Sequence, residues 1–345
     1  MSVQLDTNKS LDSQKSYENT KQEIPVIDVG PMLSGDDNQL SVVAESIYHA
    51  CSGIGFMFIV NHGMDNTIVE RCFESSRKFF NLPETEKLKV RMNRHQCGYM
   101  PPNVSIHNDT FEKRKTATKP QLSEAFKFTF DLDPEDPDFG KNRRFRGHNK
   151  WPDEIVVPGL KKSFMEFHIA FENLAHKLLP PLALSLDMPA NYFSSFFQRS
   201  SSMSRIAYYP PIKEEKNHIS LPGHTDISFL SLIPPATRPG LEILTPSGNW
   251  IKQPVIPEGI LVNTGNTLVR WINDKYIATP HRVLADTNEG RYSNIFFFYP
   301  NVDTVLKCLP SCKDASNPEK YPPITFENFH AEYATRNFGY AENWD

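Results

Sequence analysis

The chain has 345 residues, of which 39% are hydrophobic and 12% aromatic, enough for a large buried core. A net charge of −4 without a cluster of basic and aromatic residues argues against nucleic acid and anionic membranes as main partners. Five scattered cysteines and a polar first segment favour free thiols and a cytoplasmic protein. No stretch reaches the roughly 20 apolar residues that a membrane span needs.

The N-terminal part alternates apolar runs with helix signals. Residues 1–22 are polar throughout and are expected to form a disordered tail. A short strand is expected over residues 24–30, and a helix with Asp and Asn at its start over residues 37–55. A buried strand over residues 56–63 and a second helix over residues 65–83 are expected to follow.

A long loop region and a long helix are expected next. Residues 92–155 are rich in Pro, Asn, Asp and Lys, which favours loops on the substrate side. The helix that follows has one apolar stripe, and Pro180 and Pro181 are expected to bend or break it. His168, Glu172 and His176, at four-residue spacing, share a side of this helix, which we expect to be a solvated face rather than a metal site. The stripe consists of Leu160, Phe164, Phe167, Phe171, Leu174 and Leu178.

Short apolar runs separated by turn signals characterise the chain after residue 191. Such a series predicts a sandwich or a closed barrel, the jelly roll included, with helices on the outside. We expect this β core over roughly residues 200–305. Its expected strands are SRIAYYP, GHTDISFLSLI, GLEILT, WIKQPV, GILVNTG, TLVRWI, YIATPHRV and RYSNIFFFYP.

One of these expected strands begins with polar residues. His224 and Asp226 alternate with Thr225, so at strand spacing their side chains point to one face of the sheet. One imidazole and one carboxylate need a second imidazole to form the two-His, one-carboxylate set of non-haem Fe(II) oxygenases. His281, at the start of a distant strand-like run, is the best candidate for that third ligand.

A buried arginine supports this interpretation. Arg291 and Ser293 lie on one face of an aromatic strand, and Ile295 and Phe297 continue that face. A guanidinium inside an aromatic barrel needs an anionic partner, because its desolvation is costly. Its fork fits a carboxylate, to which a neighbouring hydroxyl can add a hydrogen bond. A small carboxylic acid reaching from the metal to Arg291 is therefore expected.

These features together resemble the Fe(II)/2-oxoglutarate-dependent dioxygenases, and more closely their isopenicillin N synthase-like branch. The resemblance includes segments such as IPVIDVG, GIGFMFIVNHG and RYSNIFFFYPN. The C-terminal segment CLPSC…YPPITFENFHAEY is similar to bacterial and fungal members, thymine-hydroxylase-like proteins among them. The resemblance implies an α+β fold, with a double-stranded β-helix (jelly-roll) core, flanking helices and an N-terminal α/β extension.

The resemblance also implies roles for individual residues. His224, Asp226 and His281 would bind Fe(II), with 2-oxoglutarate as co-substrate, O2 as oxidant and ascorbate as a stimulant. The co-substrate residues would be Arg291, Ser293, Tyr209 and Arg205; several plant members have Asn where Ala207 stands here. The expected substrate contacts, in a mostly non-ionic pocket, are Tyr99, Phe126, Phe128, Trp271 and Phe297.

The same resemblance implies a division of the chain into parts and a function. The expected parts are residues 23–155 as the N-terminal extension, 156–190 as a support helix, 191–305 as the catalytic core and 306–345 as a C-terminal helical segment. A monomer that hydroxylates a small molecule, releasing succinate and CO2, is expected. Two alternatives stay open: an isopenicillin N synthase-type oxidase that uses no 2-oxoglutarate, and a non-catalytic ligand-binding barrel.

Overall fold

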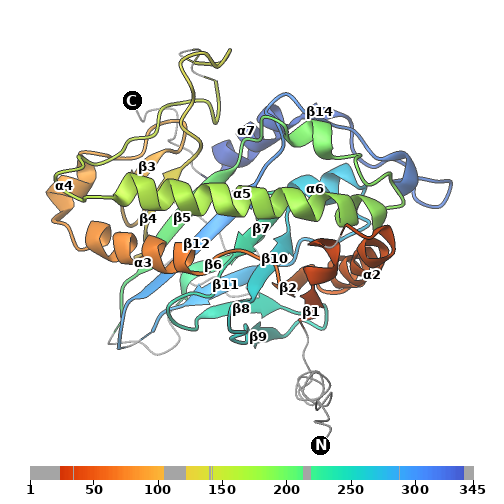
Figure 1. Cartoon of the computed structure of the whole chain (residues 1–345), viewed down its shortest axis with the longest axis horizontal. Helices are drawn as coiled ribbons and strands as arrows, with labels where there is room; N and C mark the ends of the chain where they lie inside the picture. The colour runs from red at the N-terminus through yellow and green to blue at the C-terminus, as the bar shows by residue number, and fades with distance from the viewer. Residues whose placement is uncertain are drawn as a thin grey trace, which may run out of the picture.

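An eight-stranded sheet and a four-stranded sheet form the β core of the computed structural model (Figure 1). The structure describes residues 24–33, 35–104, 122–139, 141, 143–212, 219–286 and 288–337, so the tail expected over residues 1–22 lies outside them. In spatial order, the large sheet contains β1 (Val26–Asp28), β2 (Phe56–Val60), β10 (Ile260–Thr264), β7 (Leu230–Ile233), β12 (Arg291–Phe298), β5 (Met203–Tyr209), β4 (Glu124–Phe128) and β3 (Gly98–Met100). The smaller sheet contains β6 (Ile219–His224), β11 (His281–Leu284), β8 (Leu241–Leu244) and β9 (Trp250–Lys252).

Helices surround this core, and a further strand pair lies near the C-terminus. The pair is β13 (Val305–Leu306) and β14 (Ile324–Thr325). The helices are η1 (Gly30–Leu33), α2 (Asp37–Gly53), α3 (Thr67–Phe80), α4 (Glu84–Leu88), α5 (Leu160–Leu184), η2 (Ser194–Phe197), α6 (Asn266–Trp271), η3 (Pro310–Cys312) and α7 (Phe326–Asn337). The jelly-roll core with flanking helices that the resemblance implied is confirmed.

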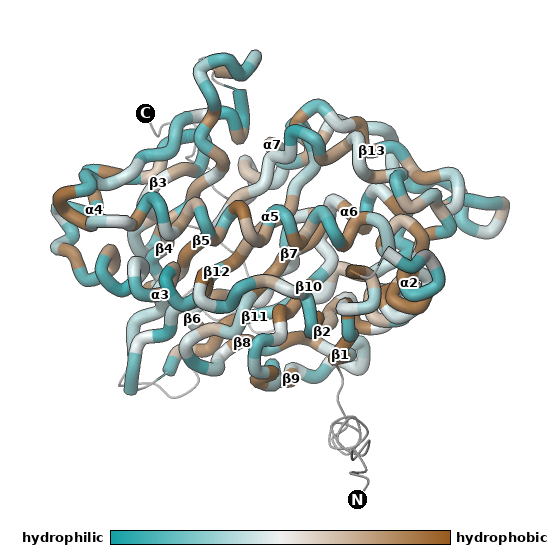
Figure 2. The backbone as a smooth tube through the Cα atoms, in the orientation of Figure 1, coloured by the Kyte–Doolittle hydropathy of each residue, from teal (hydrophilic) through white to brown (hydrophobic). Residues whose placement is uncertain are grey.

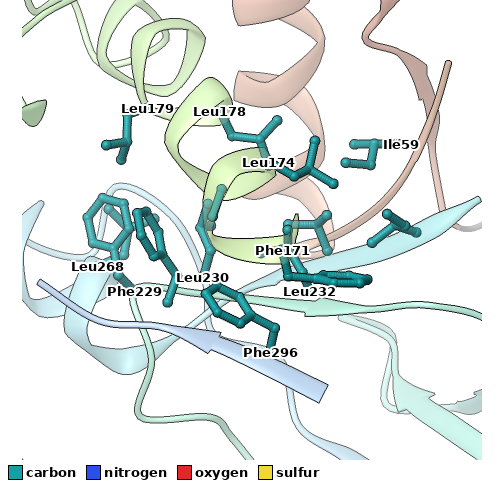
Figure 3. Packing of buried hydrophobic residues seen from close by; sticks show 14 of the residues in the cluster. Ile59, Phe171, Leu174, Leu178, Leu179, Phe229, Leu230, Leu232, Leu268 and Phe296 are labelled. Atoms are coloured by element: carbon teal, nitrogen blue, oxygen red, sulfur yellow. The ribbon is translucent and has the colours of Figure 1, made fainter. Parts of the chain in front are cut away.

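Helix α5 covers one face of the large sheet. Hydrophobic and hydrophilic segments alternate along it (Figure 2), as the apolar stripe predicted. Phe171 and Leu174 pack with Leu230, Leu232 and Phe296 of the central strands in a continuous buried cluster (Figure 3). Because side chains alternate along a strand, the residues between these apolar ones face the opposite side, toward the smaller sheet. The helix thus fixes which residues point into the space between the sheets.

The prolines of α5, which were expected to bend or break it, do not break the helix. Pro180 and Pro181 lie inside it, and it continues to Leu184. Leu178, Leu179 and Leu182 on either side of the prolines are buried in the main hydrophobic cluster. Tertiary packing therefore offsets the local cost of a proline in a helix, which is about 3 kcal/mol.

The region expected as loops over residues 92–155 contributes strands β3 and β4 to the edge of the large sheet. In β4, Phe126 and Phe128 are fully buried on the α5 side, where both pack against Phe164. Tyr99 of β3 is buried in the same cluster. The interpretation of Tyr99, Phe126 and Phe128 as substrate contacts is therefore wrong, because strand alternation turns them away from the space between the sheets.

The run TLVRWI, expected to be a strand, is helix α6. Leu268 and Trp271 recur at helical spacing and are both buried, with Trp271 in edge contact with Phe193, Phe196 and Phe229. Trp271 therefore belongs to the hydrophobic core, and its expected place at the substrate entrance is wrong. The large, flat side chain of Trp271 fills the space in the core between η2 and β7.

GHTDISFLSLI is two strands and not one. His224 is the last residue of β6 in the smaller sheet, whereas β7 in the large sheet begins at Leu230. Asp226 lies in the link between them. The polar residues therefore mark the point where the chain passes from one sheet to the other.

His168 and Glu172 of α5 are buried, so the expectation of a solvated face is wrong for these two residues, whereas His176 is partly exposed. The Nδ1 atom of His168 lies 2.9 Å from the hydroxyl oxygen of Ser204 on β5. Burial lowers the pKa of His168 to about 4. The imidazole is therefore neutral in the native protein near pH 7.

None of the described helices combines the length and apolar composition required to cross a lipid bilayer. All five cysteines are buried and none forms a disulfide.

Replacing Phe128 by Ala should lower the free energy of unfolding by about 3–5 kcal/mol, because it opens a cavity beneath α5. Urea denaturation followed by circular dichroism measures this change. Ile155→Ala is the matched surface control, since Ile155 is 88% exposed, and its effect should stay within about 0.5 kcal/mol. Equal stability of the Phe128→Ala and wild-type proteins would contradict the placement of β4.

The buried His168 should make the protein sensitive to acid. Between its ordinary pKa of 6.5 and the native value of about 4, the unfolded chain binds a proton that the native state does not, so stability falls as the pH drops. In His168→Asn this loss is absent. The difference in unfolding free energy between wild type and variant should therefore shrink by about 2 kcal/mol from pH 7.5 to pH 5. Parallel pH profiles of the two proteins would refute the assignment.

Candidate functional site

Three side chains of metal-ligand type meet between the two sheets. His224 ends β6, His281 begins β11, and the two are paired directly across these strands. The Nε2 atoms of His224 and His281 lie 3.8 and 3.6 Å from the Oδ1 atom of Asp226. Within the described part of the chain, this is the one group of three whose ligand atoms lie within 4.8 Å of one another. The structure thus brings together the three residues that the sequence nominated.

Backbone carbonyls orient both imidazoles. The Nδ1 atom of His224 lies 2.9 Å from the carbonyl oxygen of Pro222, and that of His281 lies 3.3 Å from the carbonyl oxygen of Thr279. A carbonyl only accepts hydrogen bonds, so Nδ1 carries the proton in each ring. The lone pair then resides on Nε2, which faces Asp226, as it does in histidines that bind metals.

The carboxylate of Asp226 is also held in a fixed orientation. Its Oδ2 atom accepts hydrogen bonds from the Ser231 hydroxyl at 2.6 Å and from the Asn263 amide at 2.9 Å. Oδ1 is left to face the two imidazoles. Sequence reasoning missed Ser231 and Asn263, although both are polar residues within strands that are otherwise apolar. A polar residue within an apolar strand is the sequence signal that could have identified Ser231 and Asn263.

The charges of these groups suit a cation. Burial, followed by the charge of His281, lowers the pKa of His224 to about 4. Burial alone raises the pKa of Asp226, but the two histidines and its hydrogen bonds bring it below the ordinary value. A neutral imidazole and an ionised carboxylate are the forms in which these side chains bind metal. The donor set therefore fits a divalent ion such as Fe(II).

Helix α6 fixes the link that carries Asp226. The backbone N–H of Asn266, the first residue of the helix, donates to the Asp226 carbonyl oxygen at 2.8 Å, and its side chain donates to the Thr225 hydroxyl at 2.9 Å. Gly265 precedes the helix, and a Cβ there would lie 1.9 Å from the Ser228 carbonyl oxygen. Only glycine allows the backbone of residue 265 to lie this close to Ser228. Gly265, in the sequence TGN, is therefore needed to place Asp226 as well as to form the turn.

A buried cation lies at another part of the same cavity. Arg291 is 3% exposed, and its Nε atom donates to the carbonyl oxygen of Arg238 at 3.0 Å. Its Nη1 atom is buried and has no hydrogen-bond partner among the described residues. Burial lowers the pKa of Arg291, which reflects the cost of keeping this charge out of water. The Arg291 guanidinium also lies 5.2 Å from the ring centre of Tyr209, its partner across β5 and β12.

The cavity joins the two sets of residues. Arg205, Tyr209, Ser293 and Phe297 line it as well, so these four nominated residues share one space with the candidate metal ligands. Tyr99, Phe126, Phe128 and Trp271 are not among its described lining residues. The sequence did not nominate Gln96, Met100, Lys127, Met203, Tyr299, His330 and Tyr333, which also line the cavity.

Comparisons with known families agree with this architecture. Residues 24–154 match the model of the non-haem dioxygenase in morphine synthesis N-terminal family, and residues 200–300 match the 2OG-Fe(II) oxygenase superfamily. The chain is 30% identical over 314 residues to Kihadalactone A synthase LFS of Citrus sinensis, covering 88% of this chain and 90% of that protein. It is 29% identical over 327 residues to the 2-oxoglutarate-Fe(II) type oxidoreductase hxnY of Emericella nidulans, covering 92% and 91%.

Solved structures show the same fold. The T7H protein of Neurospora crassa, in complex with alpha-KG and thymine, has a TM-score of 0.79 at 25% identity, covering 92% of this chain and 98% of that chain. JOX2, in complex with 2OG, Fe and JA, has a TM-score of 0.73 at 24% identity, covering 90% and 84%. The chain belongs to the 2OG-Fe(II) oxygenase superfamily, and it is a non-haem iron, 2-oxoglutarate-dependent oxidoreductase that acts on a small molecule.

Proposed function

We propose that the protein hydroxylates a small molecule, with Fe(II) held by His224, Asp226 and His281 and with 2-oxoglutarate held by Arg291. The observation that supports this most directly is that the three ligand side chains and the buried Arg291 line one cavity. When bound, Fe(II) and 2-oxoglutarate supply the oxidising chemistry, in which O2 gives one oxygen atom to the substrate and one to succinate as CO2 leaves.

The chain's own residues bind and orient the reactants. Arg291 offers its two terminal Nη groups to a carboxylate, since its Nε–H donates to the Arg238 carbonyl oxygen. Ser293 lies two residues after Arg291 in β12, so its side chain points to the same face of the sheet and adds a hydroxyl. Tyr209 packs against the guanidinium and keeps water from it. Ala207, opposite Ser293, offers no polar group, so the hold on the co-substrate rests on these three side chains.

The walls around the metal ligands exclude water. Phe56 packs edge-on against the imidazole of His281 at 5.5 Å between ring centres, and Ile233, Leu241 and Ile243 are buried nearby in the cluster between the sheets. An apolar wall of this kind strengthens the electrostatic interactions within the site. It also protects reactive species from water, which suits an oxidation at a carbon–hydrogen bond.

Succinate should accumulate in a one-to-one ratio with oxidised substrate when the protein turns over with Fe(II), 2-oxoglutarate and O2. A metabolite screen with succinate detection finds the substrate, and mass spectrometry of its product should show the addition of one oxygen atom. Substrate oxidation without 2-oxoglutarate would instead indicate the isopenicillin N synthase-type oxidase. A product that has lost two hydrogens would indicate desaturation.

Arg291→Gln should weaken 2-oxoglutarate binding by about 30- to 100-fold, because a charge-assisted pair contributes on the order of 2–3 kcal/mol. Anaerobic titration of the Fe(II)-loaded protein, followed by its visible charge-transfer absorption, measures the affinity. Arg71→Gln is the matched control, since Arg71 is an exposed residue of α3 paired with Glu166. Unchanged affinity in Arg291→Gln would refute the assignment.

Asn263→Ala should lower the affinity for Fe(II) by about 10- to 100-fold, because the Asp226 carboxylate loses a partner that orients it. Competition with a chromophoric Fe(II) chelator measures the change without turnover. Asn249→Ala, in the exposed turn between β8 and β9, is the control and should bind iron as the wild type does. Equal iron affinity of Asn263→Ala and wild type would show that the hydrogen bond to Oδ2 does not position the ligand.

A further inference from the structure

A second cavity lies beside helix α5, apart from the one that contains the candidate metal ligands. It has a volume of about 400 Å³, which is enough for a small molecule. The segment that follows β4 (residues 130–136), the α5 residues Glu172 and His176, and residues 197–200, from the end of η2 toward β5, contribute to its wall. No described residue lines both cavities, so this space is not part of the proposed catalytic site.

Glu172 is buried in the wall of this second cavity, and one of its two carboxylate oxygens lacks a partner. Its side chain is 6% exposed. The Oε1 atom accepts a hydrogen bond from the Ser200 hydroxyl and lies 3.2 Å from Nε2 of His176. The Oε2 atom is buried and has no hydrogen-bond partner among the residues that the structure describes. Because a buried carboxylate oxygen without a donor is costly, a ligand that supplies a donor from the cavity would stabilise Glu172.

The carboxylates around the second cavity outnumber the cations. Both of its guanidiniums are already paired with Asp138, which lies 3.1 Å from Arg199 and 3.8 Å from Arg146. Asp133 accepts a hydrogen bond from the backbone N–H of a neighbour, and neither Asp133 nor Glu172 is paired with a lysine or arginine among the described residues. The cavity therefore offers negative charge to a ligand. The carboxylates that line it are those of Asp131, Asp133, Asp136 and Glu172, and the guanidiniums are those of Arg146 and Arg199.

A metal ion does not fit this arrangement. Glu172 and His176 could supply two ligand atoms, but a metal site built from protein side chains needs at least one more close by. In the described part of the chain, the group of three potential ligands within 4.8 Å of one another is the one in the catalytic cavity. No further carboxylate, imidazole or thiol of the described residues is therefore near enough to share an ion with Glu172 and His176.

Two phenylalanines give the second cavity an apolar side. Phe130 packs edge-on against His168, and Phe197 stacks on Phe298, each at 4.4 Å between ring centres. These contacts hold both rings in place at the cavity wall. The face of an aromatic ring attracts an organic cation, and the ring also buries the hydrocarbon part of such a ligand. A negative group beside aromatic rings is therefore the combination that binds amines.

We propose that this second cavity is a binding site for a small organic cation, a protonated amine whose ammonium group donates to Oε2 of Glu172 and whose hydrocarbon part lies against Phe130 and Phe197. Asp133 adds negative charge on the same wall. The inference does not depend on the proposed function, because none of these residues lines the catalytic cavity.

The test measures binding of defined amines to the full chain by calorimetry, with and without Fe(II) and 2-oxoglutarate, under anaerobic conditions. The probes are phenethylamine and cyclohexylmethylamine, each paired with the alcohol of the same shape. The amines should bind at least about tenfold more tightly than the alcohols in both states, because only an ammonium forms a charge-assisted hydrogen bond with Glu172.

Three outcomes of this measurement overturn the proposal. The first is that no amine binds more tightly than its alcohol. The second is that 2-oxoglutarate displaces the amine, which would place the amine in the catalytic cavity. The third is that calcium ions bind in a Glu172-dependent manner while no amine binds, which would indicate a metal site instead.

Variants locate the site. Glu172→Gln should abolish the preference for amine over alcohol, since glutamine keeps the size of the side chain and removes its charge. Glu74→Gln, at an exposed position of α3, is the matched control and should bind amines as the wild type does. Full preference for amines in Glu172→Gln overturns the proposal. Phe130→Ala gives a test that does not rely on folding of the Glu172 variant: it should weaken amine and alcohol alike by about tenfold, because an apolar contact is lost. Unchanged affinities in Phe130→Ala would overturn the placement of the ligand.

Discussion

The hydrogen bonds that Ser231 and Asn263 donate to one oxygen of Asp226 are the interaction on which the site depends. They fasten the link between the two sheets to the inner face of the large sheet. Without them, the carboxylate would be free to rotate, and the two histidines on the smaller sheet would face no fixed partner. The site is therefore built from residues of both sheets, and it forms only when the two sheets are correctly packed against each other, before any ligand binds.

The large sheet positions the cavity by simple alternation. Leu230 and Leu232 of β7 face α5, so Ser231 between them faces Asp226; likewise Phe126 and Phe128 of β4 face α5, so Lys127 faces the cavity. The apolar residues under α5 thus determine where the polar ones point. A shift of register by one residue would bury the polar groups under the helix and remove the site.

The sequence predicted the site better than its surroundings. His224, Asp226, His281 and Arg291 are recognisable because polar residues in apolar strands are costly and need a reason. The substrate side was predicted poorly, because the large aromatic residues Phe126 and Trp271 satisfy the core as well as they would satisfy a pocket. Lys127 was missed since a lone lysine in a region expected as loops suggests a solvated surface. The pairing of β4 with β5, and of β3 with β4, determines that Lys127 faces the cavity, and such contacts between segments distant in the sequence leave no local signal.

The large sheet then presents two cationic positions to one cavity, and they differ in kind. Arg291 is fixed by the carbonyl oxygen of Arg238, so the rest of its fork faces one direction and suits one carboxylate in one pose. Lys127 has a compact charge on a flexible stem, which accepts anions at many angles. Between them lie Ala207 and Ser293, small residues that leave room along the strands. Arg291 is thus held in one orientation while the Lys127 side chain can adjust, and a fold that serves many chemistries is expected to vary the adjustable positions of its cavity and to keep the rigid ones.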